Sequence, residues 1–206
     1  MPTRIILLRH AESASPNVFN GAESDVDLST RGQRQAEAVA PVVVAYNLAA
    51  VISSGMQRAM KTATPIAELS GLTLQVEQDL HERRVGDLSG QSYDGLNGVW
   101  PKTVKQWMAG NIEYASHGAE SLHDMQQRLL PVWDRLLETY REQTIAVVAH
   151  GVVCKVLLVS LLPDKSPADW NALGPIYNVG IHELVHDGDW RLERLNHIAD
   201  EVKAIL

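Results

Sequence analysis

The sequence predicts an α/β fold, a three-layer α/β/α sandwich built around a mainly parallel sheet. Short aliphatic runs, typical of strands buried on both faces, alternate with segments whose apolar residues recur at helical spacing. These runs are Thr3–Leu8, Ala50–Ser53, Leu72–Val76 and Thr144–Ala149. Near the end of the chain, strand-like segments at Gly180–His186 and Trp190–Leu195 flank an Asp187-Gly188 turn signal. The alternation favours parallel strands, and the turn favours an antiparallel hairpin at one edge of the sheet.

The first two helices follow the first two strands. Thr30 with Gln33 resembles a capping box, and aliphatic residues then recur with a helical period. The second helix is expected over Met56–Leu69, where Pro65 should kink or split it.

Later helices surround an irregular insertion. Ser121–Arg141 has helical character with a bend expected at Pro131, and Val152–Leu162 is apolar enough for a buried helix. Periodicity is lost before them, in a glycine-containing stretch that holds Trp100 and Trp107. We expect one domain over residues 1–206 with a lid inserted at about 86–120, which contains a short helix and is anchored by the two tryptophans.

The composition and the net charge of the chain limit the kinds of binding partner that it can have. The chain has 206 residues, 45% of them apolar, which is enough for one sizeable core. Its formal charge of -7 argues against a surface for nucleic acid or anionic membranes. The single cysteine, Cys154, excludes an intrachain disulfide, and residues 1–10 lack the long apolar stretch of a secretory signal. We therefore expect a cytoplasmic protein without nucleic-acid or membrane partners; its oligomeric state is open, with a homodimer among the options.

One apparent metal motif is rejected on its context. Residues His182 to His186 match H-E-x-x-H, which binds zinc when both histidines share a helix face. Here the segment leads into the hairpin turn, so it is expected to be a strand. The two histidines would then lie roughly 13 Å apart at about 3.3 Å per residue, too far for one zinc ion.

Polar side chains that can take part in catalysis or in ligand binding follow four of the predicted strands. They are Arg9 and His10, Arg58, Glu82 and His150. Ligand crevices in open parallel sheets form outside the carboxyl ends of the strands, so these segments can converge on one pocket. Cations crowded together in a net-negative protein need an anion, and a phosphoryl group has the appropriate charge and geometry.

These residue types suit phosphoryl transfer. A neutral imidazole at His10 can attack phosphorus, and the arginines can stabilise the equatorial oxygens as charge spreads in the transition state. Glu82 can protonate the leaving alkoxide if it holds a proton at the working pH.

At these positions the chain resembles a known family. Leu8-Arg9-His10-Ala11-Glu12-Ser13 is similar to the L-R-H-G-E-[TS] signature of the histidine phosphatases, also called the phosphoglycerate mutase-like superfamily. Further segments agree in order and spacing: Asp27–Ala36, Ser53–Ala63, Leu80–Gly86, Gly118–Asp124 and Val148–Gly151. The resemblance implies that His10 becomes phosphorylated, that Arg9, Arg58 and His150 bind the phosphoryl group, that Glu82 is the proton donor, and that no metal ion or other cofactor takes part.

Two positions depart from the family pattern. Ala11 replaces the glycine that usually follows the nucleophile, which adds a methyl group near the expected phosphate. Asn17 corresponds to the family's phosphate-contacting asparagine, but it falls one residue later than the common spacing.

The resemblance leaves more than one activity open. A phosphatase of small phosphorylated metabolites, working through phosphohistidine at His10, is favoured because no arginine occurs between Val85 and Gln127 to hold a phosphoglycerate carboxylate. Arg83 and Arg84 keep a phosphoglycerate mutase as an alternative. A phosphoprotein phosphatase or a phosphoprotein binder of the same family is a further alternative, and the natural substrate is undetermined.

Overall fold

The computed structural model describes residues 1–92, 98–116 and 118–205, and it confirms the predicted α/β architecture. Within them, one six-stranded sheet has the order β3-β2-β4-β1-β5-β6. The first four strands along the chain are parallel: β1 (Thr3–Arg9), β2 (Ala50–Ser54), β3 (Leu74–Glu77) and β4 (Thr144–Ala149). The predicted antiparallel edge hairpin consists of β5 (Ile181–Asp187) and β6 (Asp189–His197), with β5 antiparallel to β1.

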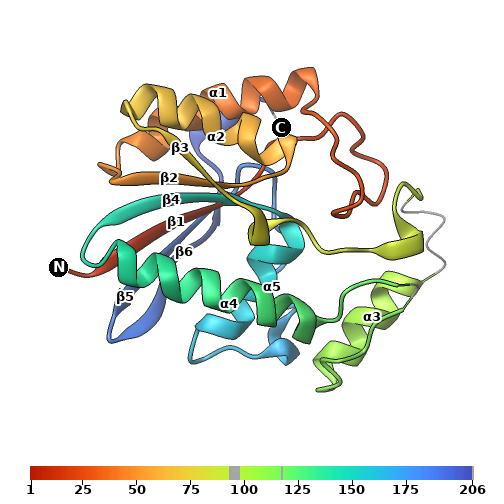
Figure 1. The fold of residues 1–206 in the computed structure, drawn as a ribbon. Coiled ribbons are helices and arrows are strands. Elements are labelled where there is room, and N and C mark those ends of the chain that lie inside the picture. Colours follow the sequence, from red (N-terminus) through yellow and green to blue (C-terminus); the bar gives the residue numbers. More distant parts are fainter. Residues whose placement is uncertain (93–97, 117, 206) are drawn as a thin grey trace.

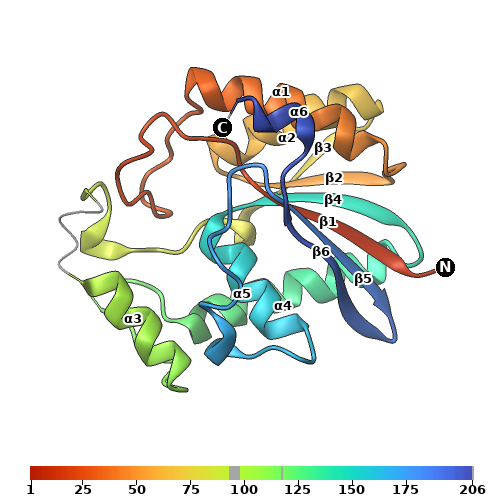
Figure 2. The same ribbon diagram turned by 180° about the vertical axis from the view of Figure 1, so that it is seen from behind.

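Helices cover both faces of this sheet. On one face lie α1 (Thr30–Val44), α2 (Gln57–Ser70) and the short α6 (Asp200–Lys203); on the other lie α4 (Leu122–Thr139) and α5 (Gly151–Leu161) (Figures 1 and 2). Helix α3 (Val99–Met108) extends beyond the end of the sheet at which β1 and β4 finish (Figure 1). The chain therefore has three layers, with α3 at the edge where a ligand crevice is expected.

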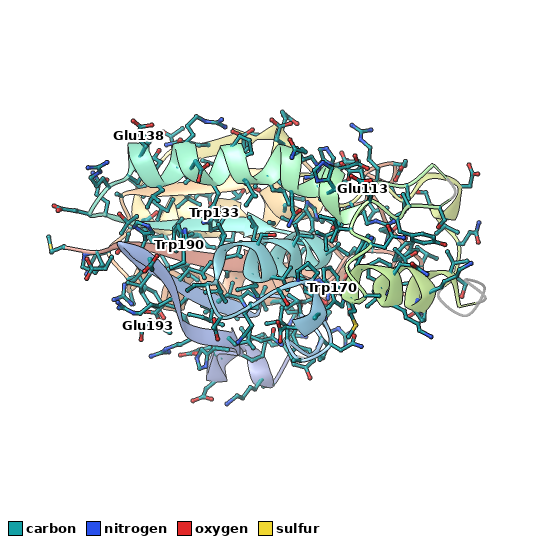
Figure 3. The ribbon with its side chains drawn as sticks, turned by 90° about the horizontal axis from the view of Figure 1, so that it is seen from below. Glu113, Trp133, Glu138, Trp170, Trp190 and Glu193 are labelled. Carbon is teal, nitrogen blue, oxygen red and sulfur yellow. The ribbon has the colours of Figure 1, made fainter. Side chains whose placement is uncertain are left out.

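Two apolar cores, one on each face of the sheet, hold the layers together. Alternate residues of the strands divide between them: Ile5 and Leu7 pack towards α4 and α5, and Ile6 and Leu8 pack towards α1 and α2. On the α4 side, the rings of Trp133 and Trp190 pack 6.1 Å apart between their centroids, and both are labelled in Figure 3. Because both faces of β1, β2 and β4 are buried, these strands could be recognised as continuous aliphatic runs.

The two prolines expected to interrupt helices do not end them. α2 continues through Pro65, and α4 continues through Pro131. A proline inside a helix costs about 3 kcal/mol. Residues that flank Pro65 and Pro131 lie in the apolar cores, and this burial offsets the lost backbone hydrogen bond.

The first helix begins one residue earlier than the capping-box pattern indicates. Its N-cap is Ser29, whose hydroxyl oxygen accepts a hydrogen bond from the backbone N–H of Gly32 at 2.9 Å. The same hydroxyl donates to a carboxylate oxygen of Glu12 at 2.7 Å. The tertiary contact with Glu12 therefore favours Ser29 over Thr30 as the cap.

Gly32 lets this helix approach the segment after β1. A Cβ atom at Gly32 would overlap the backbone carbonyl of Glu12, which already accepts the Ser29 N–H at 3.0 Å. We expect Gly32→Ala to lower the free energy of unfolding by about 1–3 kcal/mol through overpacking, measured by urea denaturation. Arg34→Ala, an exposed change on the same helix, is the matched control. Equal stability of the two variants would contradict this account of the contact.

The rejected zinc motif does lie in a strand. His182 is buried in β5, and its Nδ1 accepts the backbone N–H of Asn196 at 3.1 Å, whereas His186 packs against the ring of Trp190. In the part of the chain that the structure describes, no three His, Cys, Asp or Glu side chains gather to hold a metal ion. The described helices also include none that is long and apolar enough to cross a bilayer.

Candidate active site

The predicted residues meet at one cavity of about 280 Å³ outside the carboxyl ends of the parallel strands. Arg9 and His10 follow β1, Arg58 lies in the first turn of α2, and Glu82 follows β3. All four line the cavity. His150 does not line it, but its ring contacts that of His10, with centroids 5.1 Å apart. The parallel topology thus brings together side chains that are up to 141 residues apart in the sequence.

The hydrogen bonds of His10 define which of its nitrogens is available. Nδ1 lies 2.6 Å from the backbone carbonyl of Ala11, which can only accept, so Nδ1 carries the proton. Nε2 is then unprotonated, and its lone pair accepts a hydrogen bond from the Nε–H of Arg58 at 3.3 Å. Burial, followed by the charges of Arg58 and Arg9, holds the pKa of His10 well below 6.5. The imidazole is therefore neutral at neutral pH, with Nε2 as the nucleophilic atom.

His150 is a second neutral imidazole. It is fully buried, and its Nε2 lies 2.8 Å from the hydroxyl oxygen of Ser54 at the end of β2. Burial and the charges of Arg58, His10 and Arg9 lower its pKa well below the usual value. Its Nδ1 has no hydrogen-bond partner among the described residues.

Backbone carbonyls orient the two arginines. An Nη of Arg58 donates to the carbonyl of Ser24 at 2.7 Å, and an Nη of Arg9 donates to that of Ile176 at 2.6 Å. Arg58 is 1% exposed, so its guanidinium is held beside His10 with little freedom. These bonds to carbonyl oxygens fix the direction of each guanidinium group beside the cavity.

Glu82 reaches the cavity from the loop that follows β3. One carboxylate oxygen accepts the backbone N–H of Arg83 at 2.8 Å, and the other accepts that of Val152, in the first turn of α5, at 3.3 Å. The side chain is 9% exposed and lines the cavity. It therefore lies within the same enclosure as His10, as a proton donor to a leaving group requires.

Three further residues support the site: Thr62, which lies in a segment that matches the family pattern, and Asn178 and Val179, which have no sequence signal of their own. The hydroxyl oxygen of Thr62 accepts the Ala11 N–H at 2.9 Å and donates to the Arg58 carbonyl at 2.7 Å. The amide of Asn178 donates to the His10 carbonyl at 2.8 Å. The neighbouring Val179 has φ of 51°, a strained conformation for a β-branched residue, and its N–H bonds to the Arg9 carbonyl. Only folding brings residues 178–179 beside residues 9–10.

The two departures from the family pattern have different outcomes. Asn17 is exposed and is not among the residues that line the cavity, and its contact with a phosphate stays a prediction. Asn20 and Asn178 line the cavity instead. The methyl group of Ala11 is fully buried in the apolar core on the α1 side and does not line the cavity. It therefore does not narrow the space for a phosphate.

The buried histidines predict how stability depends on pH. Burial lowers the pKa of His182 to about 4, and the pKa values of His10 and His150 are also lowered. Between pH 6.5 and 4 the unfolded chain binds protons that the folded chain does not, so stability rises with pH in that window. His182 alone accounts for about 3 kcal/mol over this range. Urea denaturation at pH 7 and pH 5 measures the part of this effect that lies above pH 5, about 2 kcal/mol for His182.

A matched pair of variants isolates His182 in that experiment. Glutamine at position 182 cannot titrate, so His182→Gln should show a shallower loss of stability between pH 7 and pH 5. His197→Gln, at an exposed position in β6, should keep the slope of the parent. Identical slopes for the parent and both variants would show that His182 does not contribute.

Comparison with known proteins agrees with this geometry. The family model of the histidine phosphatase superfamily (branch 1) matches residues 5–198. The chain is 28% identical to glucosyl-3-phosphoglycerate phosphatase of Mycolicibacterium vanbaalenii over 98% of each sequence. It is 30% identical to phosphoserine phosphatase 1 of Hydrogenobacter thermophilus, covering 82% of this chain and 80% of that one.

The fold is also shared with a solved structure. The native structure of mycobacterial glucosyl-3-phosphoglycerate phosphatase superposes with a TM-score of 0.84 at 28% identity, covering 96% of this chain and all of that one. These relatives are named as phosphatases, in agreement with the predicted class of enzyme. The resemblance identified from the sequence is confirmed: the chain belongs to the histidine phosphatase superfamily, branch 1.

Proposed function

We propose that this protein is a phosphatase of small phosphate monoesters that works through a phosphohistidine at Nε2 of His10. The observation that carries this function is the unprotonated Nε2, which faces the Nε–H of Arg58 at the wall of the cavity. A neutral imidazole beside fixed guanidinium groups can attack a phosphate dianion without first losing a proton. Residues 1–206 would act as one domain, with the segment at about 86–120 as its lid.

The first chemical step transfers the phosphoryl group to the enzyme. Nε2 of His10 forms a bond to phosphorus as the bond from phosphorus to the ester oxygen breaks. Arg9, Arg58 and His150 hold the equatorial oxygens, and Glu82 gives its proton to the leaving oxygen, which departs as an alcohol. No charge is left on the alcohol, and Glu82 becomes a carboxylate.

The second step returns the enzyme to its starting state. Glu82 now accepts a proton from a water molecule as the water oxygen attacks phosphorus. The N–P bond breaks, inorganic phosphate leaves, and the His10 lone pair and the Glu82 proton are restored. The cationic side chains supply the charge stabilisation, so we expect activity to persist in the presence of EDTA.

A substrate panel and a trapping experiment test this function. Phosphate release should be detectable from several phosphorylated metabolites, and rapid acid-free quenching should trap a phosphoryl group that is stable in alkali, as N–P bonds are. Mass spectrometry should place it on His10. Turnover without any label on His10 would exclude this intermediate, and neither turnover nor label would favour a phosphoprotein binder.

A phosphoglycerate mutase is the second candidate, because Arg83 lines the cavity beside the proposed proton donor. Hydrolysis is favoured because relatives that match most of the chain are named as phosphatases. A coupled assay separates the two activities. Interconversion of 3- and 2-phosphoglycerate without phosphate release would support the mutase and contradict the phosphatase.

A further inference from the structure

The cavity extends past His10 into a wall built from aromatic rings and two more cations. Arg83 and Lys155 line it together with Trp100 and Trp170. Trp170 packs 5.3 Å from Trp107 and 6.2 Å from Trp100 between ring centroids, and Figure 3 shows it between α5 and α3. Neither cation has a role in the phosphoryl transfer described above.

Arg83 is a buried cation without a paired carboxylate. It is 1% exposed, its Nε donates to the carbonyl of Glu120 at 2.8 Å, and its Nη2 has no hydrogen-bond partner among the described residues. Its Cζ lies 5.4 Å from the ring centroid of Trp100 and 5.2 Å from that of Trp107. Burial lowers its pKa to about 10, so it remains charged at neutral pH.

Three carboxylates near Arg83 bond elsewhere. Glu120 pairs with Arg128 at 2.8 Å. Glu82 accepts backbone N–H groups, including that of Arg83 itself, and Glu23 accepts the backbone N–H of Gly86 at 2.9 Å. Their charges raise the pKa of Arg83 and so offset part of its positive charge at a distance, but among the described residues none of the three lies within ion-pair distance of it. A buried guanidinium with a free donor is stabilised by an anion that enters the cavity.

Lys155 adds a second charge from α5. It is half-buried, its Nζ donates to the carbonyl of Trp170 at 3.0 Å, and that atom lies 5.2 Å from the Trp170 ring centroid. Burial lowers the pKa of Lys155, and its described contacts include no carboxylate within ion-pair distance. Both of its contacts are therefore to neutral groups, and its charge is available to a ligand.

We propose that Arg83 and Lys155 form a second anion subsite, so that the preferred substrates are phosphate monoesters with a further negatively charged group. Among the described residues, the cations that line the cavity are Arg9, Arg58, Arg83 and Lys155, and the carboxylates that line it are Glu82 and Glu12, which pairs with Arg31. Arg9 and Arg58 suffice for a phosphate dianion, which leaves Arg83 and Lys155 for a carboxylate or a second phosphate. The inference rests on the proposed function and specifies its substrate class.

A matched pair of esters tests this subsite in the full-length protein. 3-Phosphoglycerate and glycerol 3-phosphate have the same phosphorylated carbon and differ by a carboxylate in place of a hydroxymethyl group. We expect kcat/KM to favour 3-phosphoglycerate by about 10- to 100-fold, the contribution of charge-assisted hydrogen bonds. Fructose 1,6-bisphosphate against fructose 6-phosphate provides the corresponding comparison for a second phosphate. Equal values within both pairs would overturn the proposal.

Substitutions test whether Arg83 and Lys155 cause the preference for esters with a second anionic group. Lys155→Met and Arg83→Met should each reduce the preference about tenfold. Lys105→Met, which removes the same charge from an exposed position on α3, should leave it unchanged. If Arg83→Met fails to fold because its tryptophan contacts are lost, Lys155→Met alone decides the result. A loss of activity that is equal for both members of each pair would contradict a subsite.

A binding measurement separates failure of this inference from failure of the proposed function. Calorimetry with the His10→Ala protein, which cannot form the phosphohistidine, should give a lower Kd for 3-phosphoglycerate than for glycerol 3-phosphate. Equal Kd values would overturn the subsite even if the parent enzyme hydrolyses esters. Absence of turnover with any ester would overturn the phosphatase, while the Kd ratio still decides the subsite.

Discussion

Replacing His10 by alanine is expected to lower kcat/KM for phosphate release by about 10⁴-fold or more, because the atom that accepts the phosphoryl group is removed. Arg9, Arg58 and His150 remain in the variant, so binding of inorganic phosphate should persist. Phosphate release and the phosphohistidine label are the two measurements. His197→Ala, at an exposed position in β6, should retain both signals.

The protonation state of His10 adds a pH test to this prediction. Burial and two arginines keep its pKa well below 6.5, so the nucleophile stays neutral as the pH falls through 6.5. The acid limb of kcat/KM that belongs to His10 should therefore lie below that value. Turnover that survives in His10→Ala, with an unchanged pH profile, would show that another residue is the nucleophile.

Replacing Glu82 by glutamine is expected to have the second largest effect, and this effect should depend on the leaving group. For alkyl phosphates kcat should fall by about 10²- to 10⁴-fold, because the alkoxide must leave without a proton. For p-nitrophenyl phosphate the loss should be much smaller, since its leaving group is stable as an anion. Glutamine has the size and shape of Glu82, and its single amide oxygen can still accept one of the two backbone N–H groups that Glu82 bonds, so the side chain should stay in place.

A control variant and a series of leaving groups test whether Glu82 is the proton donor. Glu68→Gln removes a charge from an exposed position on α2 and should leave every rate unchanged. The logarithm of kcat, plotted against the pKa of the leaving alcohol, should be steeper for Glu82→Gln than for the parent. Equal slopes for the parent and the variant would show that Glu82 is not the proton donor.

The sequence was sufficient to predict the strands and the residues that follow them. Three of the parallel strands, β1, β2 and β4, are buried on both faces, so their aliphatic runs were visible, and their ends placed Arg9, His10, Arg58 or His150 at the carboxyl edge. The helix start at Ser29 and the uninterrupted helices at Pro65 and Pro131 were not predictable in this way. In each case a contact distant in sequence, with Glu12 or with an apolar core, outweighs the local preference.

The sequence alone determined the order of strands and helices, because the periodicity of apolar residues is a local property of the chain. This order predicted the fold class and the edge of the sheet at which the candidate catalytic residues lie. The tertiary structure decided what depends on contacts between distant segments. It left Asn17 exposed, placed Asn178 against the His10 carbonyl, and brought Arg83 and Lys155 to one wall of the cavity. It also selected the His10 tautomer, since a carbonyl at Nδ1 and a guanidinium at Nε2 meet the ring only in the folded chain.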